Sequence, residues 1–268
     1  MDKLKRLSKI IGEMKSVLIA YSGGVDSTLL LRVASDVLGE KVLAVTARSA
    51  LYPQEEHRET KRITAMLEVR QIIIRQDELK IKEIRTNVPQ RCYYCKRELF
   101  STLVRLARKE GLSNIADGTN LDDLDDFRPG MKAAYEYDIR SPLREAELTK
   151  RDIRRLSRKL NLPTADKPPM ACLASRFPYG EEITQKKLKM VEKGEEFLRD
   201  LLKAKQAVRV RHHDNNIARI EVTGEEIFRL FNEEARNKVV KEFRKLGYNY
   251  VNLDLEGYRS GSMNEVIL

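Results

Sequence analysis

Short apolar runs alternate with amphipathic, helix-length segments through the first two thirds of the chain. The runs are rich in Val and Ile and cover residues 16–20, 42–46, 71–75 and 114–117. Apolar residues recur every third or fourth position over about 26–38, 53–68, 94–110 and 149–160. Strands and helices in regular alternation predict a Rossmann-like α/β fold, a parallel sheet with helices on both faces. Such sheets bind ligands at the carboxyl ends of their strands.

The pattern changes after residue 162. Residues 162–180 are rich in Pro and small residues and have neither period, which predicts a long loop that also acts as a linker. Beyond it we expect a helix over 184–203, two strands, further helix to about Leu246 and a last strand, together a small α+β domain. The predicted organisation is a first domain over 1–165, a loop over 166–183 and a second domain over 184–268.

Charge and composition limit the possible binding partners and the cellular location of the protein. The net charge of +10 raises the question of nucleic acid, because clustered cations bind phosphate by releasing counterions. Lys and Arg alternate with Glu along helical segments, however, which is typical of a solvated face, and small anionic substrates fit the charge equally well. The apolar runs are far shorter than the roughly 20 residues of a membrane span, and no signal peptide is recognisable. A cytoplasmic protein without membrane contact is expected, and nucleic acid is a secondary hypothesis.

The stretch "SGGVDS", residues 22–27, stands between the first apolar run and the first helix. Gly23 and Gly24 allow a sharp turn and close approach of a ligand, and the hydroxyls of Ser22 and Ser27 can donate to phosphate oxygens. The following helix points its positive end at the same place. We therefore expect a phosphate-binding loop for ATP, with Asp26 orienting the loop or a Mg²⁺ ion.

A second nucleotide-facing segment is expected after the fourth strand. The sequence there reads "ADGTNLDDLDDFRPG", residues 116–130, and combines turn residues with oxygen ligands. Asp117, Gly118 and Asn120 are the candidates for contact with ATP. The acidic run that follows is also explained as a solvated surface.

The three cysteines form an unusual set. Cys92 and Cys95 form "RCYYCK", a CxxC pair placed just before a predicted helix, and Cys172 lies in the long loop within "PMACLASRFPYG". A CxxC pair is found in redox disulfides, zinc sites and iron–sulfur sites. Zinc needs a fourth ligand that no histidine motif supplies, whereas three thiolates suit a four-iron cluster with one open position. Three unrelated buried cysteines are the remaining alternative.

Several motifs together resemble a known family. They are "YSGGVDSTLL", "RCYYCKRELF", "DGTNLDDLDDFRPG", "SPLREAELTKRDIRRLSRKLNLP", "DKPPMACLASRFPYG" and "DLEGYRSGSMNE". The first resembles the loop of the PP-loop, or N-type, ATP pyrophosphatases, whose fold is the adenine nucleotide alpha hydrolase-like one. The set as a whole is similar to the LarE family of ATP-dependent sacrificial sulfur transferases.

The resemblance implies a function and cofactors. Members adenylate a carboxylate of pyridinium-3,5-biscarboxylic acid mononucleotide with ATP and Mg²⁺, release pyrophosphate, and form a thiocarboxylate during biosynthesis of the nickel-pincer nucleotide cofactor. The matching cysteine, Cys172, gives up its own sulfur in the best-known form of the family. With Cys92 and Cys95 present, the chain also resembles cluster-dependent thiolases, in which the three thiolates hold a 4Fe-4S cluster that binds sulfide from an external source. We favour the cluster, and the resemblance further suggests a homo-oligomer.

Cations near Cys172 are candidates for the substrate's phosphate. Arg176 follows Cys172 by four residues, and Arg209 and Arg211 lie two apart on one face of a predicted strand, as a bidentate clamp requires. Surface arginines on a half-exposed strand would look the same. Weaker substrate-binding candidates are Ser175, Glu221 and the segment Tyr258 to Ser262, for which the sequence indicates no role.

Three other functions share some of these features. A tRNA thiolase would use the same loop and cysteines, although such enzymes carry more CxxC pairs. An amide-forming synthetase resembling NAD or GMP synthetase would leave the cysteines without a role. A nucleotide sensor would bind ATP without releasing pyrophosphate.

Overall fold

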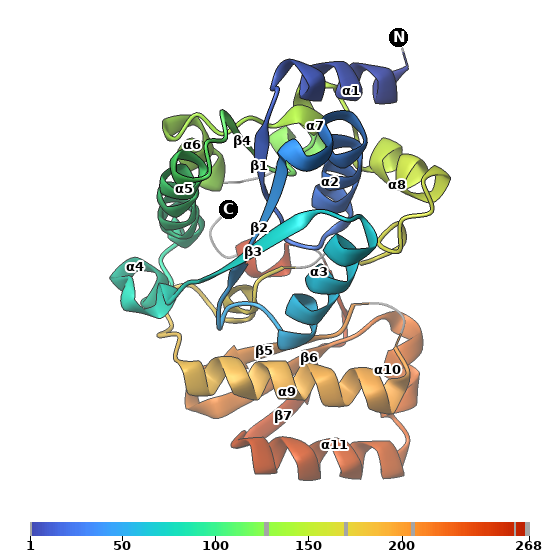
Figure 1. Ribbon diagram of the computed structural model, residues 1–268. Coiled ribbons are helices and arrows are strands. Elements are labelled where there is room, and N and C mark those ends of the chain that lie inside the picture. Colours follow the sequence, from blue (N-terminus) through green and yellow to red (C-terminus); the bar gives the residue numbers. More distant parts are fainter. Residues whose placement is uncertain (1, 126–128, 169–170, 205–206, 260, 266–268) are drawn as a thin grey trace. The chain divides into compact units, whose positions relative to one another are not determined.

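The computed structural model describes residues 2–125, 129–168, 171–204, 207–259 and 261–265 (Figure 1). The chain divides into two compact units: the first comprises Met1–Asp77 with Gln90–Lys167, and the second Glu78–Pro89 with Pro168–Leu268. Residues 78–89, which the sequence pattern placed in the first domain, therefore belong to the second unit. The reason is long-range backbone pairing, since Ile183 N donates to Arg85 O and Gly180 N donates to Asn87 O.

The first unit is built on a parallel sheet with the strand order β3-β2-β1-β4. Its strands are β1 (Val17–Ala20), β2 (Val42–Arg48), β3 (Arg70–Arg75) and β4 (Asn114–Ala116). Strand β2 pairs with one side of β1, and β3 pairs with β2 beyond it. The later strand β4 pairs with the other side of β1. The carboxyl ends of β1 and β4 therefore flank the point where the strand order reverses, which is where open α/β sheets bind ligands.

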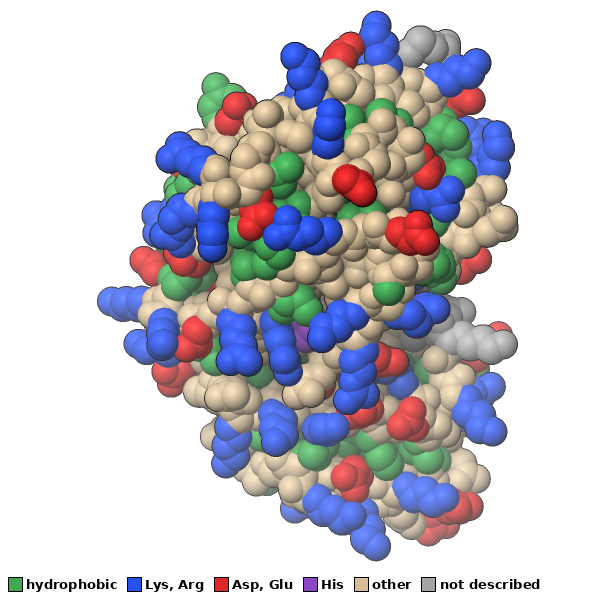
Figure 2. Space-filling model, viewed as in Figure 1, with side chains coloured by type: hydrophobic (Ala, Val, Ile, Leu, Met, Phe, Trp, Pro, Cys, Tyr) green, Lys and Arg blue, Asp and Glu red, His purple; other side chains and the backbone are tan. Residues whose placement is uncertain are grey.

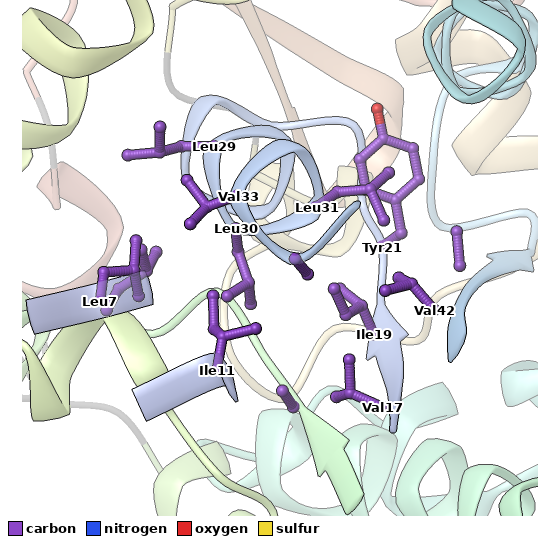
Figure 3. Close-up of a cluster of buried hydrophobic side chains, with 14 of the residues drawn as sticks. Leu7, Ile11, Val17, Ile19, Tyr21, Leu29, Leu30, Leu31, Val33 and Val42 are labelled. Atoms are coloured by element: carbon purple, nitrogen blue, oxygen red, sulfur yellow. The ribbon is translucent and has the colours of Figure 1, made fainter. Parts of the chain in front are cut away.

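Alternate side chains of β1 divide between two apolar layers. Val17 and Ile19 pack with buried residues of α1, α2, α3 and α8, such as Leu7, Ile11 and Leu29 (Figure 3). Leu18 points to the opposite layer, formed mainly with α5 and α6. The first layer uses α1 (Lys3–Glu13), α2 (Val25–Leu38), α3 (Gln54–Met66), α7 (Pro142–Glu145) and α8 (Lys150–Lys159). The second uses α5 (Arg91–Lys109) and α6 (Gly130–Glu136), so helices cover both faces, as predicted.

The second unit has a small mixed sheet in which β6 pairs antiparallel with β5 and parallel with β7. Helix α9 packs closely on this sheet and on α11, because a Cβ at Gly194 would lie 3.4 Å from Val210 of the sheet and 3.1 Å from Phe243 of α11. The elements are α4 (Lys82–Arg85), α9 (Gln185–Leu202), β5 (Arg209–His213), β6 (Ile217–Glu221), α10 (Gly224–Leu230), α11 (Glu233–Leu246) and β7 (Tyr250–Leu253). This is the α+β arrangement that the sequence predicts.

Two local differences from the sequence-based expectation matter. Helix α5 begins at Arg91, so Cys92 and Cys95 lie in its first turns and not before it. The loop around Cys172 is not entirely irregular, because Leu173–Arg176 form a 3₁₀ turn. Among the described helices, none is long and apolar enough to cross a membrane.

Candidate active site

The loop of residues 22–27 joins β1 to α2 at the point where the strand order reverses. Its two serine hydroxyls lie 3.0 Å apart, Gly24 N donates to Ser22 Oγ at 3.3 Å, and Ser27 Oγ donates to Gly24 O at 3.3 Å. Gly24 precedes the helix, and no described side chain caps it there. The first N–H groups of α2 are therefore not taken up by a described side-chain cap, and their binding of phosphate stays a prediction.

Close packing fixes the path of this loop. Gly23 has φ of +77°, and a Cβ on it would lie 2.7 Å from Thr60 Cγ2 of α3. Gly118 approaches from the end of β4, where a Cβ would lie only 3.0 Å from the backbone nitrogen of Ser27. Glycine is therefore required at both positions, and the segment after β4 lies against the phosphate loop, as the sequence predicts.

Asp117 and Asn120 organise that neighbouring segment. The buried Asp117 carboxylate accepts hydrogen bonds from Thr119 N at 3.1 Å, Thr119 Oγ1 at 2.8 Å and Ser141 Oγ at 2.9 Å. Asn120 is fully buried and donates to Asp26 Oδ1 at 3.3 Å. Both residues hold the turn in shape beside the loop, and their contact with ATP stays a prediction.

The carboxylate of Asp26 is bound by a lysine that the sequence pattern did not reveal. Lys150 Nζ lies 2.6 Å from Asp26 Oδ1, and the backbone N–H of the same lysine donates to Asp122 Oδ2 at 2.8 Å. Asp123, in the same acidic run, accepts a hydrogen bond from Asn120 N at 2.9 Å. These two aspartates are thus hydrogen-bonded and not merely solvated, and Asp26 already has a cationic partner.

A second lysine, also missed, lies on the other side of the loop. Lys167 Nζ donates to Gly23 O at 3.2 Å and to Glu56 Oε2 at 2.6 Å, and it also pairs with Glu59. Burial raises the pKa of Glu56, and the bond from Lys167 opposes this only in part. No sequence period could reveal this cluster, because Lys167 is 111 residues from Glu56 along the chain.

The CxxC pair lies on α5 in the first unit. Cys92 is exposed and Cys95 is half-buried. Because they are three residues apart in a helix, their side chains share one face. Cys172 belongs to the second unit, so the three-thiolate set stays a prediction.

The backbone around Cys172 is tightly held. Its carbonyl oxygen accepts hydrogen bonds from Ser175 N at 3.0 Å, Ser175 Oγ at 2.9 Å and Arg176 Nη1 at 3.2 Å. Arg176 is in turn paired with the buried Glu195 through two bonds of 2.8 and 3.1 Å. Burial alone would raise the pKa of Glu195, but the charge and hydrogen bonds of Arg176, together with Arg209 and the Val210 N–H, outweigh it and lower the pKa. Arg176 and Ser175 therefore fix the cysteine loop.

The two strand arginines are buried in the described structure. Arg211 Nη2 lies 2.6 Å from Glu221 Oε2, and its Nη1 donates to Ser175 O at 3.0 Å. The Arg211 Nε is buried without a hydrogen-bond partner among the described residues. Arg209 stacks on Tyr258, with 5.2 Å from its guanidinium carbon to the ring centroid.

The C-terminal segment contributes to this group. Ser262 Oγ accepts a bond of 3.2 Å from Arg211 and lies 3.4 Å from Glu221 Oε1. Tyr258 and Ser262 thus contact the two arginines, a role for this segment that the sequence did not indicate, while Ser260 lies outside the described residues. Across the ranges that the structure describes, no three His, Cys, Asp or Glu side chains come together as a metal-binding group.

A phosphate-binding loop at the reversal point of a parallel sheet defines a nucleotide-binding protein of the PP-loop class. No protein-family model matches the chain. An uncharacterized protein of Synechocystis sp. is 43% identical over 99% of this chain and 98% of its own length. The pyridinium-3,5-bisthiocarboxylic acid mononucleotide synthase of Lactiplantibacillus plantarum is 38% identical over 99% of this chain and 95% of its own length.

A more distant relative supports the class. One subunit of the glutamine-hydrolyzing GMP synthase of Saccharolobus solfataricus is 26% identical over 74% of this chain and 58% of its own length. The close relatives decide the family: the chain belongs to the LarE family, and it is an enzyme of the ATP-dependent sulfur transferase class. The resemblance seen in the sequence motifs is thereby confirmed.

Proposed function

We propose that this enzyme converts carboxylates of pyridinium-3,5-biscarboxylic acid mononucleotide into thiocarboxylates during biosynthesis of the nickel-pincer nucleotide cofactor. The observation that carries the proposal is the 38% identity, over nearly the full length of both chains, to a synthase named for the bisthiocarboxylic product. The phosphate loop supports it independently, because a carboxylate must be activated before sulfur can replace its oxygen.

ATP, entering as its Mg²⁺ complex, supplies that activation. A carboxylate oxygen attacks the α-phosphorus, the bond from this phosphorus to the oxygen shared with the β-phosphate breaks, and pyrophosphate leaves. Sulfur then attacks the carbonyl carbon of the acyl-adenylate, and AMP leaves with the electrons of the carbon–oxygen bond. Ser22, Ser27 and the N-terminal amides of α2 hold the phosphates through these steps. Asp26 as a Mg²⁺ ligand would first have to lose its bond to Lys150.

The donor set of Cys92, Cys95 and Cys172 fits a four-iron, four-sulfur cluster. Two of the thiols share one face of α5 in its first turns, and the third is carried on a loop whose backbone Arg176 and Ser175 hold in place. Held by these three residues, such a cluster would supply one iron with an open coordination position for an external sulfide. The chain's own residues bind the substrate and keep Cys172 in place.

Sacrificial transfer is the second candidate, favoured by the half-buried position of Cys172 in a fixed turn. The Cys172 thiolate would attack the adenylate and form a thioester as AMP leaves. Loss of the Cα proton and cleavage of the Cβ–Sγ bond would then release the thiocarboxylate and leave dehydroalanine. This route needs neither Cys92 nor Cys95.

Arg209 and Arg211 are proposed to bind the phosphate of the pyridinium mononucleotide. The unpartnered, buried Nε of Arg211 supports this role, because a buried donor without an acceptor is costly and a phosphate oxygen would satisfy it. Glu221 is fully buried and orients Arg211, while Arg176 and Ser175 act through the loop. A tRNA substrate is less well supported, since Figure 2 shows Lys and Arg spread over the visible face with Asp and Glu between them.

The test is anaerobic purification with iron and sulfide analysis, followed by intact mass after turnover with ATP and the pyridinium substrate. We expect iron and sulfide in the wild type, loss of both in Cys92→Ala, and an unchanged protein mass after turnover. Absence of iron together with loss of one H₂S from Cys172 would replace the cluster route with the sacrificial one. Absence of pyrophosphate release, with or without tRNA, would contradict the proposed function.

A further inference from the structure

Lys167 occupies an unusual position beside the phosphate loop. It follows α8 and is the last residue of the first unit, and its backbone is anchored because its carbonyl oxygen accepts a bond of 2.8 Å from Arg154. From this fixed base its ammonium reaches the carbonyl oxygen of Gly23, 144 residues away in the sequence. The Lys167 side chain is 13% exposed, so its charge is mostly withdrawn from water.

Two carboxylates share this ammonium. Lys167 bonds to both Glu56 and Glu59, and Arg62 lies 4.0 Å from Glu59 on its other side, so a cluster of exchangeable ion pairs stands beside the phosphate loop. The raised pKa of Glu56 reflects this crowded, buried setting. The two carboxylates are 19% and 28% exposed, and Glu59 also lines an open groove with Arg58 and Arg62. The cluster is therefore accessible to an incoming anion.

We propose that Lys167 is a polyphosphate-binding residue, which exchanges Glu56 and Glu59 for the β- and γ-phosphates when ATP or pyrophosphate occupies the loop. The inference rests on the proposed function and adds a residue and a specificity to its ATP site. A lysine suits the exchange, since its ammonium is a compact charge on a flexible stem with three donors that need no fixed fork geometry. Its bond to Gly23 O already places the ammonium at the turn of the loop.

The two glutamates then have a function of their own. In the absence of ligand they hold the ammonium at the loop and prevent its exposure to solvent. When phosphates are bound, the same carboxylates repel them, which weakens the binding of the pyrophosphate that the reaction must release. Lys167 and the glutamates should therefore have opposite effects on affinity for pyrophosphate.

The test is isothermal titration of the full-length protein with Mg²⁺–pyrophosphate and, separately, with AMP. The lysine and glutamate variants should change the affinity for pyrophosphate in opposite directions. Lys167→Met is expected to weaken pyrophosphate binding tenfold or more and to change AMP binding less than twofold. The double variant Glu56→Gln with Glu59→Gln is expected to tighten pyrophosphate binding several-fold. Lys61→Met, an exposed position on α3, removes the same charge and should leave both affinities unchanged.

A purely structural cluster would give a different pattern. Both the lysine and the glutamate variants would then weaken pyrophosphate and AMP binding together, and either that result or an unaltered affinity in Lys167→Met would overturn the inference. The glutamate variants decide the question even if Lys167→Met fails to fold. Failure of the proposed function is distinguishable, because the wild-type protein would then release no pyrophosphate from ATP with the pyridinium substrate, whatever its affinity for pyrophosphate.

Discussion

The two units hold their cations in different ways. Beside the phosphate loop, the side chains of Lys150 and Lys167 are 38% and 13% exposed, and each bonds to half-buried carboxylates. In the second unit, Arg176 and Arg211 are 4% and 6% exposed, and their partners Glu195 and Glu221 are buried almost completely. The first arrangement uses flexible point charges, and the second uses planar groups with several fixed bonds.

This difference supports the roles proposed for the lysines, which would exchange carboxylates for phosphates, and for Arg176, which holds the cysteine loop in place. A fully buried ion pair cannot give up its partner without leaving a desolvated charge, whereas a lysine whose carboxylate partners still contact water can exchange one oxygen for another at a lower cost. Arg176 therefore serves to fix the cysteine loop, although its position near Cys172 resembles that of a substrate ligand. The lysines, which look like surface charges in the sequence, lie where a polyphosphate would bind.

The largest expected effect concerns the buried ion pairs of the second unit. Arg176→Met removes both close ionic bonds of the buried Glu195 and leaves it only the Val210 N–H and Arg199 at 3.7 Å, so we expect the free energy of unfolding of the second unit to fall by about 3–5 kcal/mol. Urea unfolding followed by circular dichroism measures it. Lys167→Met is the matched control and should cost about 1 kcal/mol or less, because its partners remain in contact with water. Equal losses in the two variants would contradict the difference between the units.

A second buried group of the second unit gives a pH dependence. His212 is fully buried between Phe177 and Tyr248, and burial, with a smaller contribution from Lys187, lowers its pKa to about 4. Glu181 Oε1 lies 3.5 Å from its Nε2 and does not reverse the shift. The imidazole is therefore neutral in the folded protein at neutral pH.

The direction in which stability changes with pH depends on which state, folded or unfolded, binds the proton first. The pKa of a histidine in the unfolded chain is about 6.5, so the unfolded state takes up a proton first as the pH falls. Stability contributed by this group is complete above about pH 6.5 and is lost between about pH 6.5 and 4, by about 3 kcal/mol in all. Urea midpoints measured across this range check the loss, and His212→Phe should remove most of it. A variant with the same pH dependence would assign the effect to another group.

The third effect concerns the loop itself, which is held by backbone geometry and not by charge. Gly23→Ala combines a positive φ with a contact of 2.7 Å to Thr60. We therefore expect the free energy of unfolding to fall by about 1–2 kcal/mol. Pyrophosphate binding should be lost as well. Gly24→Ala has φ of −77° and 3.4 Å of clearance from Ser22, and should be nearly neutral in stability. Thr60→Ser, which lacks the clashing methyl, should restore part of the loss in Gly23→Ala.

The sequence predicts well what depends on neighbours in the chain. The strand–helix alternation and "SGGVDS" locate the phosphate loop, since periodicity and turn chemistry are local properties. Prediction from the sequence fails where the contacting residues are far apart along the chain. The pairing of Lys167 with Glu56, or of residues 78–89 with the segment before α9, has no periodic signature. The burial of Arg211 depends on Glu221, which the antiparallel register of β5 and β6 places opposite Arg209 and diagonally across from Arg211.

The smallest expected effect compares helix N-termini of the two units. Thr149 caps α8 in a capping box with Asp152, and Thr184 caps α9 through a bond from Lys187 N at 3.2 Å. Thr149→Ala and Thr184→Ala should each cost about 1 kcal/mol in urea unfolding and leave pyrophosphate binding unchanged. Helix α2 begins at Gly24 instead, where no described side chain takes this role and its amides stay open to phosphate. Bound pyrophosphate should therefore stabilise the protein by the same amount in both capping variants, and a reduced gain would mean that these caps also serve the ligand.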